Sequence, residues 1–328
     1  LRKFEILGPD AEELMDYTLT RNVKKLSVGQ IVYSSMCYEN GSMFDDGTLL
    51  KMSDHGFRWV CGDEYAGEWL KEQAKKKKFN VLVKNSTDQI NNISLQGPNS
   101  RKILEKFIFT PPTQPSISEL QWFRFTICRV RELSGIPLMV SRTGYTGELG
   151  YEIWCHPSDA PAVWDVLMEA GKDEGLIPAG FGALDLLRIE AGLILFGNEF
   201  DGQVDPFEAG VGFTVPLKTK TADFIGKEAL IKRKENPQKK LVGLELVGKE
   251  KANHGDCVHI GRSQVGVVTS GCLSPTLNKN IALCRIDVGH SEIGMNVEVG
   301  KIDGHQKRIP AKIVGFPHYD PQKTRVKS

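Results

Sequence analysis

Residues 141–154 read Ser-Arg-Thr-Gly-Tyr-Thr-Gly-Glu-Leu-Gly-Tyr-Glu-Ile-Trp. Glycine recurs there at every third position, as Gly144, Gly147 and Gly150. Because glycine reaches positive φ without a steric cost, this spacing predicts a tight polar turn. Strand-like residues flank the turn over 136–140 and 152–154. Tyr145 and Glu148 lie inside the turn. They either line a binding site or are incidental polar residues of a structural hairpin, and the spacing alone leaves both interpretations open.

The composition is that of an ordinary globular protein. Of 328 residues, 40% are hydrophobic and 25% charged, enough for two or three domains with a large core. Lys and Arg total 42 against 41 Asp and Glu, so the net charge is +1 and no basic excess points to nucleic acid. No apolar run approaches the ~20 residues of a membrane span, and we expect no signal peptide. We therefore expect neither nucleic-acid nor membrane partners.

Seven cysteines are scattered along the chain, mostly among apolar residues, and no Cys-x-x-Cys pair occurs. They are Cys37, Cys61, Cys128, Cys155, Cys257, Cys272 and Cys284. This pattern is typical of reduced, buried thiols in a reducing compartment, so we expect a cytoplasmic protein, or a mitochondrial matrix protein in a eukaryote. The seven histidines are equally dispersed, and no spacing predicts a metal site.

A strand, a Gly-Pro pair, a polar residue and a helix follow one another twice, at residues 4–15 and 93–107. In the first copy we expect Asp10 to be the N-cap of the helix. This weak internal repeat predicts two related α+β halves. Three prolines within 111–115 suggest a linker between the halves, and a further helix is expected over 183–195.

After Lys218 the chain changes to short apolar runs separated by Gly, Asn and Pro turns. The expected strands are 241–247, 256–260, 264–269, 281–286, 296–299 and 308–314. Regular short strands of this kind predict a compact β-barrel or sandwich. We therefore divide the chain into two α+β domains, 1–110 and 111–235, and a β-domain, 236–328.

Five segments in order resemble the glycine-cleavage T-protein (aminomethyltransferase) superfamily of tetrahydrofolate-dependent one-carbon transferases. They are residues 41–50 (GSMFDDGTLL), 95–98 (LQGP), 141–154, 183–201 (ALDLLRIEAGLILFGNEFD) and 269–283 (TSGCLSPTLNKNIAL). Together they cover nearly the whole chain. The resemblance implies an α+β fold with two related domains around a central folate cavity, followed by a C-terminal β-barrel domain.

The resemblance also implies a catalytic carboxylate at Asp46, beside the folate N5. That nitrogen must be oriented, and its proton accepted, as it takes a carbon unit. Strand alternation places Asp45 and Asp46 on opposite faces, so only one of them can face a central cavity. Asp45 is retained as a neighbouring cofactor-binding residue. If the resemblance is set aside, the alternative is that Asp45 and Asp46 are two solvent-exposed residues of a hairpin.

Four more residues are expected at the folate site. Glu148 matches the family's Thr-Gly-Glu glutamate, which is expected to accept two N–H bonds from the pterin edge, with Tyr145 bordering the ring. Arg188 lies on a largely apolar helix and needs a partner. It either contacts folate or forms a structural ion pair with one of three acidic residues, Asp185, Glu190 or Glu199. Tyr319 lies near the C-terminal stretch that closes the folate site in relatives.

Two departures from the family pattern touch the expected substrate or folate surroundings. T-proteins usually read Ala-Arg-Asp where this chain has Ala183-Leu184-Asp185, and they carry an asparagine where it has Cys61-Gly62-Asp63. Both differences favour side branches of the superfamily, such as the dimethylsulfoniopropionate demethylase and the folate domains of sarcosine and dimethylglycine dehydrogenases. Residues 4–10 match a segment that lies several dozen residues into relatives, so we expect the first part of domain one to be absent.

The leading prediction is an aminomethyltransferase that uses tetrahydrofolate and takes its one-carbon unit from a lipoylated carrier protein. One alternative is a tetrahydrofolate-dependent demethylase whose small-molecule donor is a sulfonium, an amine or an ether. A second is a folate-binding protein without transfer activity. Superfamily members of that kind serve in iron–sulfur assembly and carry a Lys-Gly-Cys motif, which is not found here.

Overall fold

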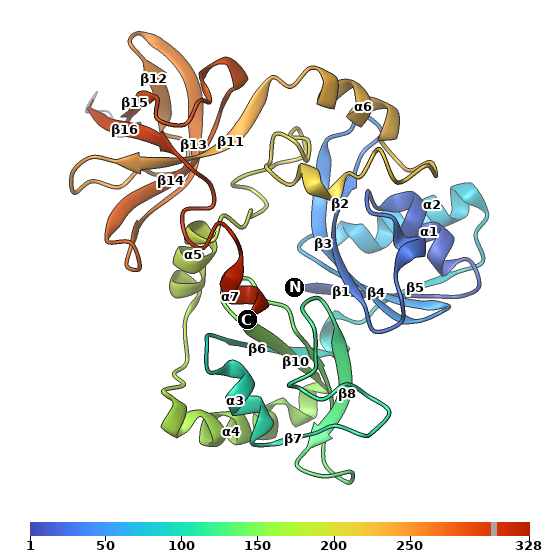
Figure 1. Cartoon of the computed structure of the whole chain (residues 1–328). Helices are drawn as coiled ribbons and strands as arrows, with labels where there is room; N and C mark the ends of the chain where they lie inside the picture. The colour runs from blue at the N-terminus through green and yellow to red at the C-terminus, as the bar shows by residue number, and fades with distance from the viewer. Residues whose placement is uncertain (303–306) are drawn as a thin grey trace. The chain divides into compact units, whose positions relative to one another are not determined.

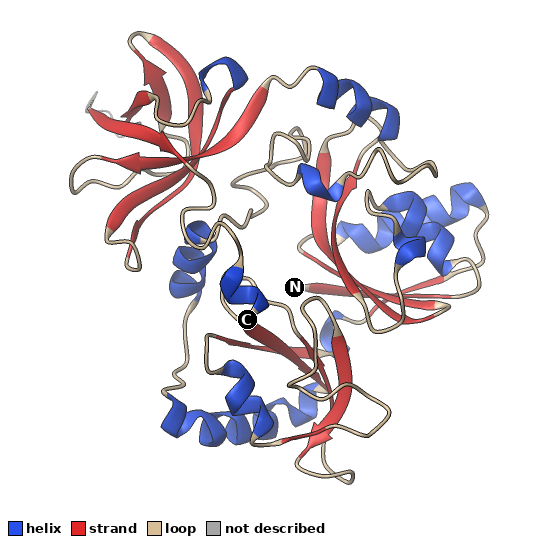
Figure 2. Cartoon of the chain, viewed as in Figure 1, coloured by secondary structure: helices blue, strands red, loops and turns tan. Residues whose placement is uncertain are grey.

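The structure of the protein, a computed structural model, describes residues 1–302 and 307–328. The described strands form two five-stranded sheets and a closed six-stranded barrel (Figures 1 and 2). The chain divides into two compact units. Unit 1 comprises Leu1–Ser34, Gly47–Gly180 and Lys323–Ser328, and unit 2 comprises Ser35–Asp46 and Phe181–Gln322.

The first sheet has the strand order β2-β3-β4-β1-β5. Its strands are β1 (Arg2–Leu7), β2 (Ile31–Cys37), β3 (Met43–Ser53), β4 (Gly56–Cys61) and β5 (Leu82–Asn85). β1 pairs antiparallel with both β4 and β5, and β3 pairs antiparallel with β4. Helices α1 (Ala11–Thr18) and α2 (Tyr65–Lys77) belong to this part of the chain, and each buries an apolar face.

The second sheet has the strand order β6-β10-β9-β8-β7. Its strands are β6 (Asn91–Gln96), β7 (Ile108–Phe109), β8 (Phe125–Val130), β9 (Pro137–Ser141) and β10 (Gly150–Cys155). Helices α3 (Ser100–Glu105) and α4 (Ala160–Gly171) pack on it through a shared apolar core that includes Leu104, Tyr151 and Leu167. The order of this sheet brings β6 beside β10, the strand that follows the glycine turn.

The expected linker at 111–115 is wrong. These residues lie between β7 and β8, which pair with each other inside the second sheet. The prolines therefore mark a loop within one sheet, since proline ends a strand wherever its missing N–H would be needed. The limits 1–110, 111–235 and 236–328 stay a prediction.

The predicted repeat is visible at the start of each copy. Gly8 follows β1 with φ 135°, and Gly97 follows β6 with φ 120°, so both strands end in the same glycine-dependent bend before a helix. Asp10 occupies the N-cap position of α1 but makes no capping hydrogen bond there. Its carboxylate instead accepts a 2.7 Å hydrogen bond from the backbone N–H of Asn80, so the predicted N-cap position is confirmed while the side chain itself does not cap the helix.

The barrel closes in the order β11-β14-β13-β12-β15-β16. Its strands are β11 (Lys239–Leu246), β12 (Cys257–Ile260), β13 (Ser263–Ser274), β14 (Lys279–Asp287), β15 (Asn296–Gly300) and β16 (Arg308–Val314). Inward-facing residues such as Leu244, Val258 and Ile286 are fully buried in its core. With the two sheets, this barrel confirms the predicted class of two α+β domains and a C-terminal β-barrel, while the central folate cavity stays a prediction.

Three further helices complete the described chain: α5 (Phe181–Glu190), α6 (Lys227–Glu235) and α7 (Thr324–Lys327). Short 3₁₀ turns occur at Val23–Lys25, Thr87–Gln89, Pro157–Asp159, Lys172–Glu174, Gly212–Thr214 and Val288–His290. The helix expected over 183–195 ends at Glu190 because Gly192 adopts φ 66°. A Cβ on Gly192 would lie 2.7 Å from the Phe316 ring, so the chain turns there in close contact with that ring.

Candidate functional site

The glycine turn joins β9 to β10 within unit 1. Its two strands pair antiparallel, with Ser141 opposite Glu152 and Val140 opposite Ile153. The predicted turn between two strands is therefore confirmed.

The three glycines of the turn differ in their geometry. Gly147 has φ 77°, a region in which an L side chain is strained. Gly144 and Gly150 lie against the side chain of Gln96 instead. A Cβ on them would lie 2.0 Å and 1.9 Å, respectively, from the Gln96 Oε1 atom. A side chain at either position would therefore force the Gln96 amide group to move.

Gln96, the last residue of β6, holds the turn through its amide group. Its Nε2 donates hydrogen bonds to the backbone oxygens of Thr143 and Tyr151, at 3.3 Å and 3.2 Å. Its Oε1 accepts a 3.1 Å hydrogen bond from the Thr146 hydroxyl. The same hydroxyl accepts a longer hydrogen bond, 3.4 Å, from the backbone N–H of Glu148. A continuous path of hydrogen bonds therefore runs from Gln96 to the backbone of Glu148.

The Glu148 carboxylate is mostly shielded, with 17% of its side chain exposed. Its Oε1 lies 3.6 Å from Nε of Arg325, on α7, whose side chain is 50% exposed. Two further arginines of unit 1, Arg101 and Arg142, donate to the backbone oxygen of Ser328 at 2.7 Å and 2.5 Å. The segment that carries Arg325 is thereby attached to the same unit as the glycine turn.

Tyr145 also lies in the turn and is half-buried. The sequence places it three residues before Glu148. It shares the turn that Gln96 supports, so its backbone position depends on the same framework. Its expected place beside a pterin ring stays a prediction.

The carboxylates of Asp45 and Asp46 lie on β3, in the part of the strand that belongs to unit 2. Asp45 is 1% exposed, whereas Asp46 is partly exposed. The Asp45 carboxylate accepts a 2.9 Å hydrogen bond from the backbone N–H of Asp46. Of the two, Asp46 is the one that solvent can reach.

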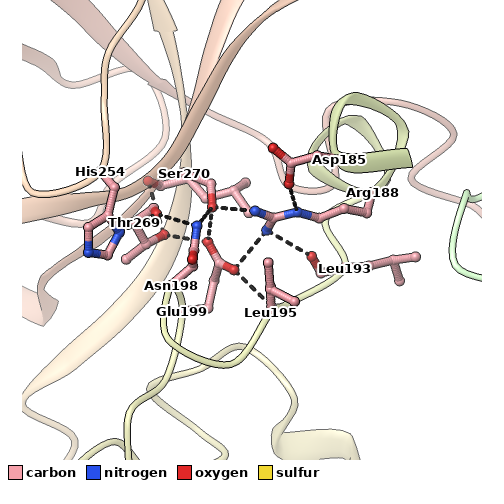
Figure 3. A network of polar contacts seen from close by, with 10 residues as sticks. Asp185, Arg188, Leu193, Leu195, Asn198, Glu199, His254, Thr269 and Ser270 are labelled. Atoms are coloured by element: carbon pink, nitrogen blue, oxygen red, sulfur yellow. Dashed lines mark hydrogen bonds and ion pairs between the residues drawn. The ribbon is translucent and has the colours of Figure 1, made fainter. Parts of the chain in front are cut away.

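Arg188 lies on α5 at the centre of a polar network (Figure 3). Its Nε is 2.8 Å from Oδ1 of Asp185, and its Nη1 is 2.8 Å from Oε2 of Glu199. Its Nη2 donates to the Ser270 hydroxyl at 2.8 Å, and Nη1 also donates to the backbone oxygen of Leu193. The structural ion pair considered from the sequence is therefore present with Asp185 and Glu199. A folate contact for Arg188 stays a prediction.

Glu199 is the acceptor that organises this network, and its side chain is fully buried. Its Oε2 accepts from the backbone N–H of Leu195 at 2.9 Å, in addition to Arg188. Its Oε1 accepts from the hydroxyls of Thr269 and Ser270, at 2.8 Å and 2.6 Å (Figure 3). These four donors satisfy the hydrogen-bonding capacity of the buried carboxylate.

Glu190, the third possible partner of Arg188, makes other contacts. Its carboxylate accepts hydrogen bonds from the hydroxyls of Ser274 and Thr276, at 2.5 Å and 2.8 Å. Its backbone oxygen accepts a 2.9 Å hydrogen bond from the backbone N–H of Tyr319, whose side chain is half-buried. α5 is thus joined to β13 and to the segment of Tyr319 within unit 2. The expected folate contact of Tyr319 stays a prediction.

The expected site residues divide between the two units. Tyr145 and Glu148 belong to unit 1, whereas Asp45, Asp46, Arg188 and Tyr319 belong to unit 2. Sequence reasoning missed the supporting roles of Gln96 and Thr146. The Leu95-Gln96-Gly97-Pro98 segment was part of the family resemblance, but it predicted no role for Gln96.

Six of the seven cysteines are buried and Cys257 is partly exposed, which confirms the expected burial. Burial raises the pKa of the Cys128 thiol to about 12 and that of the Cys284 thiol to about 12. Burial, with the nearby carboxylates of Glu190 and Asp185, raises the pKa of Cys272 to about 11. These thiols are protonated near neutral pH, so none of the three is a nucleophile there.

Within residues 1–302 and 307–328, no group of three or more His, Cys, Asp or Glu side chains is arranged to hold a metal ion. Among the same residues, no helix has the length and apolar character needed to cross a membrane.

Comparison with known proteins gives consistent matches. The GCVT N-terminal domain matches residues 1–219, and the glycine cleavage T-protein C-terminal barrel domain matches residues 239–320. A trimethylamine-oxide aldolase of Ruegeria pomeroyi is 58% identical over the whole chain, which spans 42% of that relative's length. An aminomethyltransferase of Symbiobacterium thermophilum is 40% identical, with 97% of this chain and 84% of the relative covered.

A solved structure matches as well. The glycine cleavage system aminomethyltransferase T from Bartonella henselae has a TM-score of 0.84 at 25% identity, covering 97% of this chain and 83% of that one. Both halves of the family pattern, the N-terminal domain and the barrel, thus occur here in order. The resemblance seen in the sequence is confirmed, and the chain belongs to the glycine cleavage T-protein family.

Proposed function

We propose that this chain is a tetrahydrofolate-dependent one-carbon transferase. The observation that carries the proposal is the shielded Glu148 carboxylate, held in a glycine turn of a chain that matches the family through both its domains. The aminomethyltransferase names of relatives that are 39–40% identical support the same reaction class.

The residues of the turn fit the chemistry of a reduced pterin. A carboxylate that is largely shielded from water can accept two N–H bonds from the amide and amino edge of the ring, and the low local dielectric strengthens both bonds. Glu148 has this environment, and Tyr145 on the same turn offers an aromatic face or edge. We assign these two residues to the pterin, and Arg188, Asp45 and Tyr319 to the rest of the folate surroundings.

Asp46 is the proposed catalytic residue. Tetrahydrofolate supplies a nucleophilic secondary amine, N5, when it is bound. A carboxylate beside that amine orients it and accepts its proton as the carbon unit is transferred. Asp46 suits this task better than Asp45, because its side chain is partly exposed while that of Asp45 is buried.

The one-carbon donor has two candidates. The aminomethyltransferase relatives favour an aminomethyl group presented by a lipoylated carrier protein. The Ruegeria relative, 58% identical, is named for trimethylamine oxide, and this favours a methylated amine donor. That name describes a whole protein of which this chain matches 42%, so we place the carrier protein first. We also propose a cytoplasmic location, or the mitochondrial matrix in a eukaryote, which suits seven free thiols.

Folate binding tests the proposal directly. Calorimetry and thermal unfolding of the chain with tetrahydrofolate and its methyl and methylene forms should show binding heat and a raised Tm. No heat and no Tm shift with any reduced folate would refute it. A turnover assay with tetrahydrofolate that compares a lipoylated carrier protein with methylated amines and sulfonium compounds would then identify the donor.

A further inference from the structure

The glycine turn carries Glu148 but is supported from outside itself. Gln96 lies on β6, the strand that pairs with β10, with Gln96 opposite Gly150 in the register. Its side chain fills the space next to Gly144 and Gly150, and it would have to move if either residue carried a Cβ. Because Gln96 is fixed by a sheet rather than by a loop, it offers the turn a rigid reference.

The hydrogen bonds of Gln96 have a directional pattern that only an amide can satisfy. Its Nε2 donates to the two carbonyl oxygens of Thr143 and Tyr151, while its Oε1 accepts from the Thr146 hydroxyl. A glutamate at this position would offer only acceptors when ionised and would face two carbonyl oxygens. An apolar residue of similar shape would leave those carbonyls and the buried hydroxyl without this partner.

Thr146 connects Gln96 to Glu148 by hydrogen bonds. Its hydroxyl donates to Gln96 and can therefore direct a lone pair toward the backbone N–H of Glu148. Thr146 is 4% exposed, so water does not readily replace either hydrogen bond. The orientation of the Glu148 backbone in turn sets the direction in which its carboxylate projects.

We propose that Gln96 and Thr146 are positioning residues for the pterin-binding carboxylate, acting on Glu148 through the hydrogen bonds Gln96–Thr146 and Thr146–Glu148. The proposal rests on the proposed folate function. It assigns a role to the glutamine of the Leu95-Gln96-Gly97-Pro98 segment, whose amide group lies against Gly144 and Gly150. Neither Gln96 nor Thr146 is required to touch the ligand.

The variants Thr146→Val and Thr146→Ser test the proposal as a matched pair. Valine keeps the shape of threonine and removes the hydroxyl, whereas serine keeps the hydroxyl and removes the methyl group. With tetrahydrofolate as the probe, we expect Thr146→Val to bind roughly threefold to tenfold more weakly, the cost of one hydrogen bond, and Thr146→Ser to recover most of that loss. Gln96→Met should weaken binding at least as much as Thr146→Val.

Two measurements separate positioning from general stability. Hydrogen exchange of the unliganded chain should show faster exchange of the Glu148 amide in Thr146→Val and Gln96→Met than in Thr146→Ser. In the Glu148→Gln background, Thr146→Val should weaken folate binding less than it does in the unsubstituted chain, since coupled residues are not additive.

The outcomes distinguish this inference from the function on which it rests. If the unsubstituted chain binds tetrahydrofolate and Thr146→Val binds it equally well with unchanged Glu148 exchange, the positioning role is overturned and the function stands. If Thr146→Ser loses as much affinity as Thr146→Val, the hydroxyl is not responsible and the proposal also fails. If the unsubstituted chain binds no reduced folate, both the function and the inference fall.

Discussion

Arg188 and Glu199 form an ion pair inside unit 2, with 2.8 Å between Nη1 and Oε2 and with 1% and 0% of the two side chains exposed. The pair joins α5 to the segment after it, and Thr269 and Ser270 of β13 donate to the same carboxylate. A charge buried in this way is stable only while its partners remain, because desolvation costs several kcal/mol for each ion.

Removal of the negative charge should therefore destabilise the fold. We expect Glu199→Gln to lower the free energy of unfolding by about 3 kcal/mol, since it leaves the buried Arg188 guanidinium without its buried counter-ion. Asp185→Asn is the matched control. This substitution removes the second carboxylate that pairs with Arg188. Because the Asp185 side chain is 53% exposed, we expect the free energy of unfolding to fall by less than about 1 kcal/mol. Urea unfolding measures the free energy of unfolding of both variants. An equal decrease in the two variants would contradict the central role of Glu199.

Asp46 should matter for turnover and not for folate affinity. With Asp46→Asn, we expect kcat to fall by roughly 10²–10⁴, the usual contribution of a general base, while the Kd for tetrahydrofolate stays within about twofold. Asp54→Asn, at an exposed position next to β3, is the control and should leave both values unchanged. A normal kcat in the Asp46→Asn enzyme would remove Asp46 from the mechanism.

Glu148 should matter for folate affinity. Glu148→Gln keeps the size of the side chain but replaces one acceptor oxygen by a donor, so we expect tetrahydrofolate to bind roughly tenfold to a hundredfold more weakly. Glu105→Gln, on the exposed side of α3, is the control and should bind normally. Calorimetry gives both affinities. Wild-type affinity in the Glu148→Gln chain would show that the glycine turn is a hairpin with no part in the site.

The buried thiols should resist alkylation in the folded chain. With the pKa of Cys128 raised by burial to about 12, the thiolate fraction at pH 8 is roughly one in ten thousand, and it grows as the pH rises toward that pKa. We expect iodoacetamide at pH 8 to modify Cys257, the partly exposed cysteine, first. Mass spectrometry of peptides before and after urea unfolding checks this. Equal labelling of Cys128 and Cys257 in the folded chain would contradict it.

The strands, the barrel and the glycine turn could be predicted from the sequence because they depend on local properties. Short apolar runs, turn glycines and the Gly-Pro pairs act over a few positions, and the barrel strands and the glycine turn overlap the predicted ranges. Two features that the sequence did not reveal depend on partners elsewhere in the chain. Residues 111–115 form a loop between the paired strands β7 and β8, and the carboxylate of Asp10 binds the backbone of Asn80 instead of capping its helix.

The sequence by itself determined that Gly144, Gly147 and Gly150 form a turn between two strands and that Glu148 lies on it. It did not determine which side chain lies against two of those glycines. Gly147 has a positive φ, a local property, whereas Gly144 and Gly150 lie against the side chain of Gln96, which comes from another strand of the sheet. Close packing between segments far apart in the chain depends on how they fold together, and no local pattern records it.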